Sequence, residues 1–78
     1  MINILLFKFL EKIHLASCDF KCLKKSSLKK YFKNNQFYNL ERFCLINHLI
    51  TIDYNEYSLT MEGITLFNFL KIYIKVYK

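Results

Sequence analysis

The stretch that decides the predicted fold is residues 37–63, FYNLERFCLINHLITIDYNEYSLTMEG. Residues 37–48 predict a helix, because their side chains form stripes at helical spacing. Residues 49–52 and 57–59 have strand-forming composition and flank a turn at residues 53–56, which predicts a hairpin. The stretch ends in Leu-Thr-x-x-Gly, where a threonine N-cap is expected to open another helix.

Three elements are predicted before this stretch. Residues 2–16 place apolar side chains at helical spacing, which predicts an amphipathic first helix. Residues 19–22 suit a short extended strand. A second helix is expected from Leu28 to about Lys33, with Ser26 and Ser27 as N-caps and a turn at residues 33–36.

The last helix is expected from Met61 to about Val76, and it is apolar almost all round. Gly63 lies in its first turn, where a glycine costs about 1 kcal/mol relative to alanine. We therefore expect close backbone packing there. One face of the helix can cover its own domain, and the other needs a partner. The predicted dimer interface comprises Leu66, Phe69, Leu70, Ile72, Tyr73 and Val76.

Length and composition favour one small, intracellular domain that forms a homodimer. The chain has 78 residues, of which 54% are hydrophobic and 18% aromatic, more apolar surface than so small a body can bury. The expected organisation is a single α+β domain, mainly α, with the first helices and the hairpin in residues 1–60 and a dimerisation helix in residues 61–78. Three cysteines predict reduced thiols in a cytoplasmic setting. Neither a signal peptide nor a transmembrane helix is expected.

Lysines concentrate just before the decisive stretch. The net charge of +6 favours an anionic partner, nucleic acid or a membrane surface, although it can also serve solubility. Six lysines lie within thirteen residues that contain no acid: Lys21, Lys24, Lys25, Lys29, Lys30 and Lys33. Lysines against phosphates release counterions, so the cluster predicts salt-sensitive nucleic-acid binding. The alternative is a solvated lysine face.

Polar side chains near the start of the helix at residues 37–48 are the second group of candidates. Asn35, Gln36, Tyr38, Asn39 and Arg42 lie there, where a recognition helix meets base edges and phosphates. The only arginine, Arg42, can bind a guanine edge or a phosphate with two hydrogen bonds. The ordinary alternatives are partial burial of Tyr38, a helix cap for Asn39 and an ion pair for Arg42.

Metal binding and catalysis are not expected. His14, Cys18 and Cys22 have helical spacing but lack the paired ligand spacing of a structural zinc site. No nucleophile–base pattern, Walker motif or dinucleotide-binding loop is present. We therefore predict a protein that is not an enzyme and has no cofactor.

The hairpin and the Leu59-Thr60-x-x-Gly63 ending resemble the winged helix-turn-helix superfamily over roughly residues 26–76. MarR-type and PadR-type regulators share this ending, and small archaeal DNA-binding proteins with a long C-terminal dimer helix are similar. The family's usual glycine before the first hairpin strand is His48 here. The resemblance implies a DNA-binding role, with residues 37–48 as recognition helix and residues 61–77 as dimer helix.

The sequence thus predicts a homodimeric protein that binds double-stranded DNA, as a small transcriptional regulator or a DNA-coating protein in the nucleoid or a host cytoplasm. Asp53 and Glu56 at the hairpin repel phosphate, so the wing is not expected in a minor groove. The alternative is a phage- or plasmid-borne protein-interaction module that inhibits a host protein complex. The excess apolar surface and the acidic hairpin favour that alternative.

Overall fold

The computed structural model describes residues 4–18 and 23–77, and over these ranges the chain is mainly helical with a small three-stranded antiparallel sheet. This confirms the predicted α+β class. The elements in chain order are α1 (Ile4–Cys18), β1 (Leu23–Lys24), α2 (Lys25–Lys29), α3 (Asn34–Ile46), β2 (Ile50–Asp53), β3 (Glu56–Leu59) and α4 (Met61–Tyr77). The predicted strand at residues 19–22 lies outside the described ranges.

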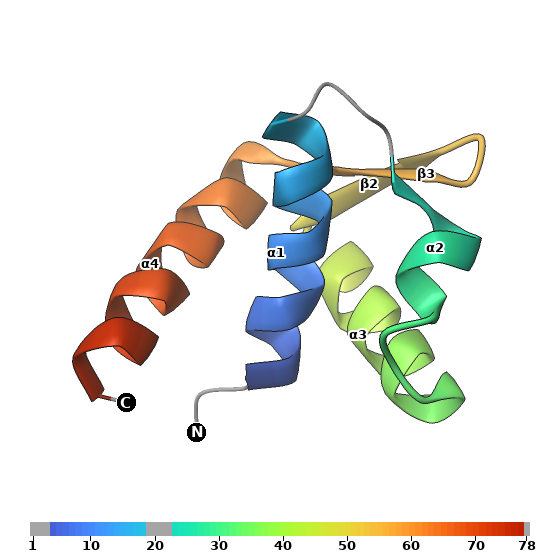
Figure 1. Ribbon diagram of the computed structural model, residues 1–78. Helices are drawn as coiled ribbons and strands as arrows, with labels where there is room; N and C mark the ends of the chain where they lie inside the picture. The colour runs from blue at the N-terminus through green and yellow to red at the C-terminus, as the bar shows by residue number, and fades with distance from the viewer. Residues whose placement is uncertain (1–3, 19–22, 78) are drawn as a thin grey trace.

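Helix α1 runs through the middle of the molecule, with α4 on one side and α2 and α3 on the other (Figure 1). The sheet has the order β1-β3-β2, so β3 is its central strand. Tyr57 on β3 pairs with Leu23 on β1 and with Ile52 on β2. This pairing ties the segment before α2 to the hairpin.

Aromatic rings from four elements and the connection after α2 form the core. Phe9 of α1 contacts Phe32, Phe37 and Tyr57, with ring centroids 5.8, 6.0 and 6.3 Å apart. On the opposite side of α1, Phe7 stacks on Phe67 of α4 at 5.3 Å. Burying rings of this size contributes strongly to stability. Helix α1 is therefore the element on which both halves of the fold pack.

Helix α3 ends in a Schellman motif, which reverses the chain into β2. The amide of Leu49 donates to the carbonyl of Cys44 at 2.8 Å, and the amide of His48 donates to Leu45 at 3.2 Å. His48 has a φ of 57°, the left-handed conformation that this motif needs and that glycine usually supplies. A histidine thus occupies the left-handed position that ends α3.

The start of α4 confirms the predicted cap and the predicted role of Gly63. The amide of Gly63 donates to the hydroxyl oxygen of Thr60 at 3.0 Å, and the Thr60 amide donates to the Leu49 carbonyl, also at 3.0 Å. A Cβ atom on Gly63 would lie 2.0 Å from that same Leu49 oxygen. Glycine is therefore required because the backbone of α4 touches the segment that follows α3.

The hairpin turn is tighter than the sequence suggested. Only Tyr54 and Asn55 separate β2 from β3, whereas the predicted turn covered residues 53–56. Both have positive φ, 52° and 63°, as a two-residue type I′ turn requires. Asp53 and Glu56 face each other as the last pair of the ladder.

Two predicted helix boundaries were wrong. Helix α2 covers Lys25–Lys29 rather than residues 28–33, so Ser26 and Ser27 lie inside it and do not cap it. Its first amide, that of Lys25, instead donates to the carbonyl of Asn55 in the hairpin turn at 3.0 Å. Helix α3 begins at Asn34 rather than at Phe37, which leaves residues 30–33 as the turn between the two helices.

Candidate functional site

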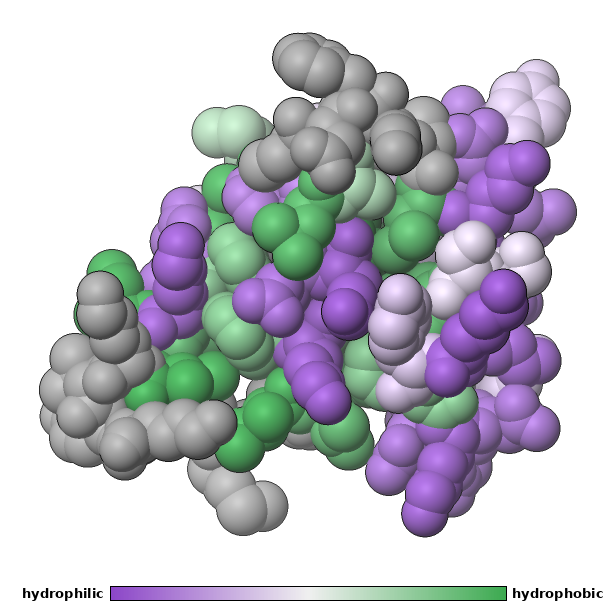
Figure 2. Space-filling view, viewed as in Figure 1, coloured by the Kyte–Doolittle hydropathy of each residue, from purple (hydrophilic) through white to green (hydrophobic). Residues whose placement is uncertain are grey.

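The predicted lysines on α2 and its flanks lie together at one end of the molecule. Lys24, Lys25 and Lys29 line an open hollow of about 400 Å³ with Ser26 and with Asn55 of the hairpin turn. Lys30 and Lys33 follow on the exposed surface of the turn before α3. Hydrophilic side chains gather over α2 and the adjoining end of the hairpin (Figure 2). Lys21 lies outside the described residues.

Helix α3 presents a polar stripe to solvent. Phe37, Leu40 and Cys44 are buried, so its opposite face carries Asn35, Asn39 and Arg42, all exposed. Asn39 lies in the second turn of the helix and is therefore not its cap. The structure brings these three predicted residues onto one exposed face of α3, and Figure 1 shows α2 beside α3.

Two of the predicted contact residues take part in starting α3. The side-chain carbonyl of Gln36 accepts from the Lys33 amide at 3.4 Å, and that of Asn35 accepts from the Gln36 amide at 2.8 Å. These bonds satisfy polar groups at the helix start. Gln36 is also half-buried, so its first role in the free protein is local structure.

Tyr38 is the best-defined side chain of the surface. Its ring packs edge-on against Phe37 at 5.5 Å, and its hydroxyl accepts a hydrogen bond from the ammonium group of Lys29 at 3.1 Å. The ammonium groups of Lys25 and Lys29 lie 5.2 and 5.0 Å from its ring centroid. The hydrogen bond from Lys29, together with the charges of both lysines, lowers the pKa of the Tyr38 phenol. The sequence identified Lys25, Lys29 and Tyr38 as candidates, but it did not predict that the two ammonium groups lie against the tyrosine ring.

A second apolar surface begins where the polar stripe ends. Phe43, Leu45 and Ile46, near the C-terminus of α3, are 47%, 41% and 66% exposed. Helix α3 is therefore polar over its first half and partly apolar over its second half.

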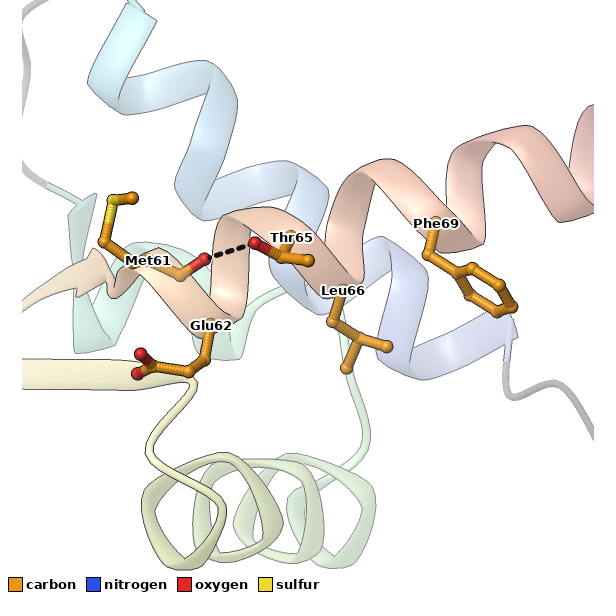
Figure 3. Close-up of a pocket in the computed structure, with 5 residues that line it drawn as sticks. All are labelled: Met61, Glu62, Thr65, Leu66 and Phe69. Carbon is orange, nitrogen blue, oxygen red and sulfur yellow. Dashed lines mark hydrogen bonds between the residues drawn. The ribbon is translucent and has the colours of Figure 1, made fainter.

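The outer face of α4 exposes three of the six predicted dimer residues. Phe69 is 59% exposed, Ile72 64% and Tyr73 38%, and Leu66 is half-buried. A shallow hollow along this face is lined by Met61, Glu62, Thr65, Leu66 and Phe69 (Figure 3). Leu70 does not belong to this face, because it is only 4% exposed and packs in the protein's own core. The side chain of Val76 lies outside the described part of the structure.

The described residues contain no metal cluster and no membrane span. Within residues 4–18 and 23–77, no three His, Cys, Asp or Glu side chains are placed to hold a metal ion. The His14 ring packs on Phe67 at 4.7 Å. No helix in these ranges is both long and apolar enough to cross a bilayer.

Two buried groups have raised pKa values. Burial raises the pKa of the Cys44 thiol to about 12. Burial also raises the pKa of the Tyr57 phenol, which donates a hydrogen bond to the Glu41 carboxylate and so is held neutral. Both groups are part of the core that supports α3.

Comparisons of the chain with protein-family models, with curated proteins and with solved structures found no match in any of the three.

Proposed function

We propose that this protein is a winged-helix protein that binds nucleic acid inside the cell, as a homodimeric regulator or DNA-coating protein. The order of its elements and the sheet order β1-β3-β2 are those expected of a winged helix. In this proposal α2, the four-residue turn and α3 form the helix-turn-helix, with α3 as recognition helix. The β2–β3 hairpin is the wing, and it rests on α2 through the bond between Lys25 and Asn55.

The observation that carries the proposal is the continuity of two surfaces. Lys25 and Lys29 of α2 contact Tyr38 of α3, and Tyr38 neighbours Asn39 on the same exposed side of that helix, which also carries Asn35 and Arg42. Cationic side chains supply affinity for phosphates, and a helix with exposed amide and guanidinium groups can hydrogen-bond base edges in a major groove. If the lysines served only solubility, there would be no reason for exposed amide and guanidinium groups beside them.

A duplex titration at several salt concentrations tests the proposal. The affinity should fall steeply with salt. Lys29→Glu combined with Lys30→Glu should reduce the affinity at least tenfold at low salt, because the two substitutions remove contacts between ammonium groups and phosphates; they should also lower the slope of affinity against salt. Lys8→Glu combined with Lys71→Glu is the matched control, since these exposed lysines lie on α1 and α4 and the net charge changes equally. Absence of binding to any nucleic acid at low salt would overturn the proposal, as would equal effects of the two double variants.

The homodimer is proposed to form through the outer face of α4. A standard interface covers about 800 Å² per partner. The exposed parts of Met61, Phe69, Ile72 and Tyr73 supply a continuous apolar centre for such an area.

Light scattering tests the dimer. It should give twice the chain mass, and Phe69→Asp or Ile72→Asp should give a folded monomer, because both side chains are exposed in the single chain. Leu70→Asp is the contrast, since it places a charge in the core and should unfold the protein. A wild-type chain that stays monomeric at high micromolar concentration would refute the dimer.

The second candidate function is binding of a partner protein. It is favoured by exposed Phe43, Leu45 and Ile46 on α3, where a DNA-reading helix would be polar, and by Asp53 and Glu56 at the hairpin. Its partner would be a protein with an apolar patch of matching size. A stable complex that forms independently of DNA, and that Ile46→Asp abolishes, would establish this function instead.

A further inference from the structure

A cationic hollow lies where the hairpin meets α2. Three lysines, Lys24, Lys25 and Lys29, line it together with Ser26 and Asn55. The hydrogen bond from the Lys25 amide to the Asn55 carbonyl fixes the hairpin turn against the start of α2. Glu56 lies opposite Lys24 in the β1–β3 ladder but does not line the hollow, whose charged lining residues are the three lysines. Ammonium, hydroxyl and amide groups around one hollow suit a phosphate.

Tyr38 borders this hollow with a partly exposed aromatic ring. Its ring is 45% exposed, and the ammonium groups of Lys25 and Lys29, which line the hollow, lie near it. Edge-on packing against buried Phe37 holds the ring in place. The charge of the Glu41 carboxylate acts on Tyr38, and this carboxylate accepts a hydrogen bond from the hydroxyl of Tyr57. A fixed ring thus lies beside a site for phosphate.

Tyr54 supplies a second exposed ring, in the hairpin turn. It is 90% exposed and precedes Asn55, which lines the hollow. Its φ of 52° is a conformation that bulky L residues rarely adopt. Folding gains little from a side chain so exposed, and asparagine or glycine would suit this turn better. The tyrosine is therefore better explained by contact with another molecule than by the stability of the hairpin.

We infer that the hollow and its two tyrosines bind unpaired nucleotides of a single-stranded polynucleotide. The phosphate lies among Lys24, Lys25 and Lys29, and the neighbouring bases stack on Tyr38 and Tyr54. This inference rests on the proposed nucleic-acid binding and names the form of the ligand. Aromatic rings beside a basic groove bind single strands, because every unpaired base offers a face for stacking. In a duplex these faces are covered by neighbouring base pairs.

The acidic residues of the hairpin agree with this ligand. Asp53 and Glu56 lie next to Tyr54 and Asn55. A hairpin inserted into a duplex groove would bring these carboxylates between two rows of phosphates. A single strand has one row, which the hollow can hold on the lysine side of the hairpin while the bases turn toward the tyrosines.

Binding of labelled 20-nucleotide oligothymidylate, oligouridylate and a 20-base-pair duplex, followed by fluorescence anisotropy at low salt, tests the inference. The test variant combines Tyr38→Leu with Tyr54→Asn, and the asparagine suits the positive φ of that turn. We expect about a tenfold or greater loss of single-strand affinity and a clearly smaller loss for the duplex, because stacking on exposed bases contributes only to single-strand binding. Tyr31→Leu is the control, because Tyr31 is 58% exposed and lies near Lys12 but does not line the hollow.

Intrinsic fluorescence gives a second measurement, because the chain contains six tyrosines and no tryptophan. Stacked bases should quench tyrosine emission in the wild type, and the double variant should lose this quenching. The two oligonucleotides decide whether the natural strand is DNA or RNA. Single-strand binding that the double variant leaves unchanged would overturn the inference, as would binding of duplex alone; both results leave the proposed nucleic-acid binding intact. Failure of all three probes would overturn both.

Discussion

Replacing Gly63 with alanine should destabilise the protein, although alanine is the better helix former. The added Cβ would lie 2.0 Å from the Leu49 oxygen and 3.0 Å from the Leu49 carbonyl carbon. The obstacle is backbone rather than a flexible side chain. Relief therefore requires the start of α4 to move away from the segment between α3 and β2.

The size of the effect follows from three contributions. Overpacking of a tight site costs about 1–3 kcal/mol. The movement also strains the hydrogen bond from the Thr60 amide to the same Leu49 oxygen, and such a bond contributes about 0.5–1.5 kcal/mol. These losses are partly offset, because alanine is more favourable than glycine in a helix by about 1 kcal/mol. The expected net loss is about 2 kcal/mol, which is a large part of the total for a domain of this size.

Urea unfolding at 25 °C followed by circular dichroism measures this loss, and thermal unfolding should show a midpoint about 10–15 °C lower. Asn68→Ala is the matched control, because it also introduces a better helix former, at an exposed position of the same helix. This variant should be neutral or slightly stabilising. A Gly63→Ala protein within about 0.5 kcal/mol of the wild type would refute the close contact of α4 with Leu49.

Three further predictions concern single residues. His48→Gly should stabilise the protein by about 0.5–1 kcal/mol, since it removes the strain of a left-handed histidine at φ 57°. His48→Ala keeps a Cβ atom at this position and should give no gain in stability. Urea unfolding measures both variants. The pKa values of Cys44 and Tyr57 are raised in the folded protein, so the unfolded chain ionises these two groups at a lower pH than the folded chain does. The free energy of unfolding should therefore fall as the pH rises from about 9 toward 12, by at most about 1.4 kcal/mol per pH unit for each of the two groups. Unfolding curves measured between pH 7 and 11 should show this loss, and Cys44→Ala should make it shallower. Tyr38→Phe should remove a tyrosine whose pKa lies below the ordinary phenol value from an absorbance titration at 295 nm, and Lys29→Met should raise the pKa of Tyr38.

The helices and the hairpin could be predicted from the sequence because each has a local signal. The periodic apolar positions identify α1 and α3, and the Leu59-Thr60-x-x-Gly63 segment identifies the start of α4. The reason for Gly63 was also predictable, because a glycine in a first helical turn needs a contact to explain it. What the sequence could not supply was the contacting partner, the carbonyl of Leu49.

The boundaries of α2 failed for a physical reason. Serines before an apolar residue are good caps, yet the first amide of α2 is satisfied by Asn55, thirty residues later in the chain. A long-range bond of this kind leaves no pattern near Ser26. The start of α3 was placed three residues late, because asparagines that read as a turn also suit the first turn of a helix.

The candidate site was partly predictable in the same sense. The lysines and the polar residues of α3 were identified as types, because charge and hydrogen-bonding capacity are visible in sequence. Their grouping with Asn55 and Tyr54 was not, because it depends on where the hairpin turn docks. Two consecutive residues of positive φ in a short turn leave a weak signal when one of them is tyrosine rather than asparagine or glycine.

The contact at Gly63 also bears on the proposed function. It holds α4 against the end of α3, through Leu49, while Phe67 holds α4 against α1. If α4 pairs with a second copy, the position of each α3 relative to the dimer axis is set by this contact and not by the hairpin. A variant that shifts α4 without unfolding the protein should therefore change the preferred spacing between two binding sites, while leaving the affinity for an isolated site and for single strands unchanged. A Gly63→Ala protein that remains folded at low temperature, titrated against paired sites at varied spacing, would separate these effects. An unchanged spacing preference would mean that the two α3 helices are not positioned through α4.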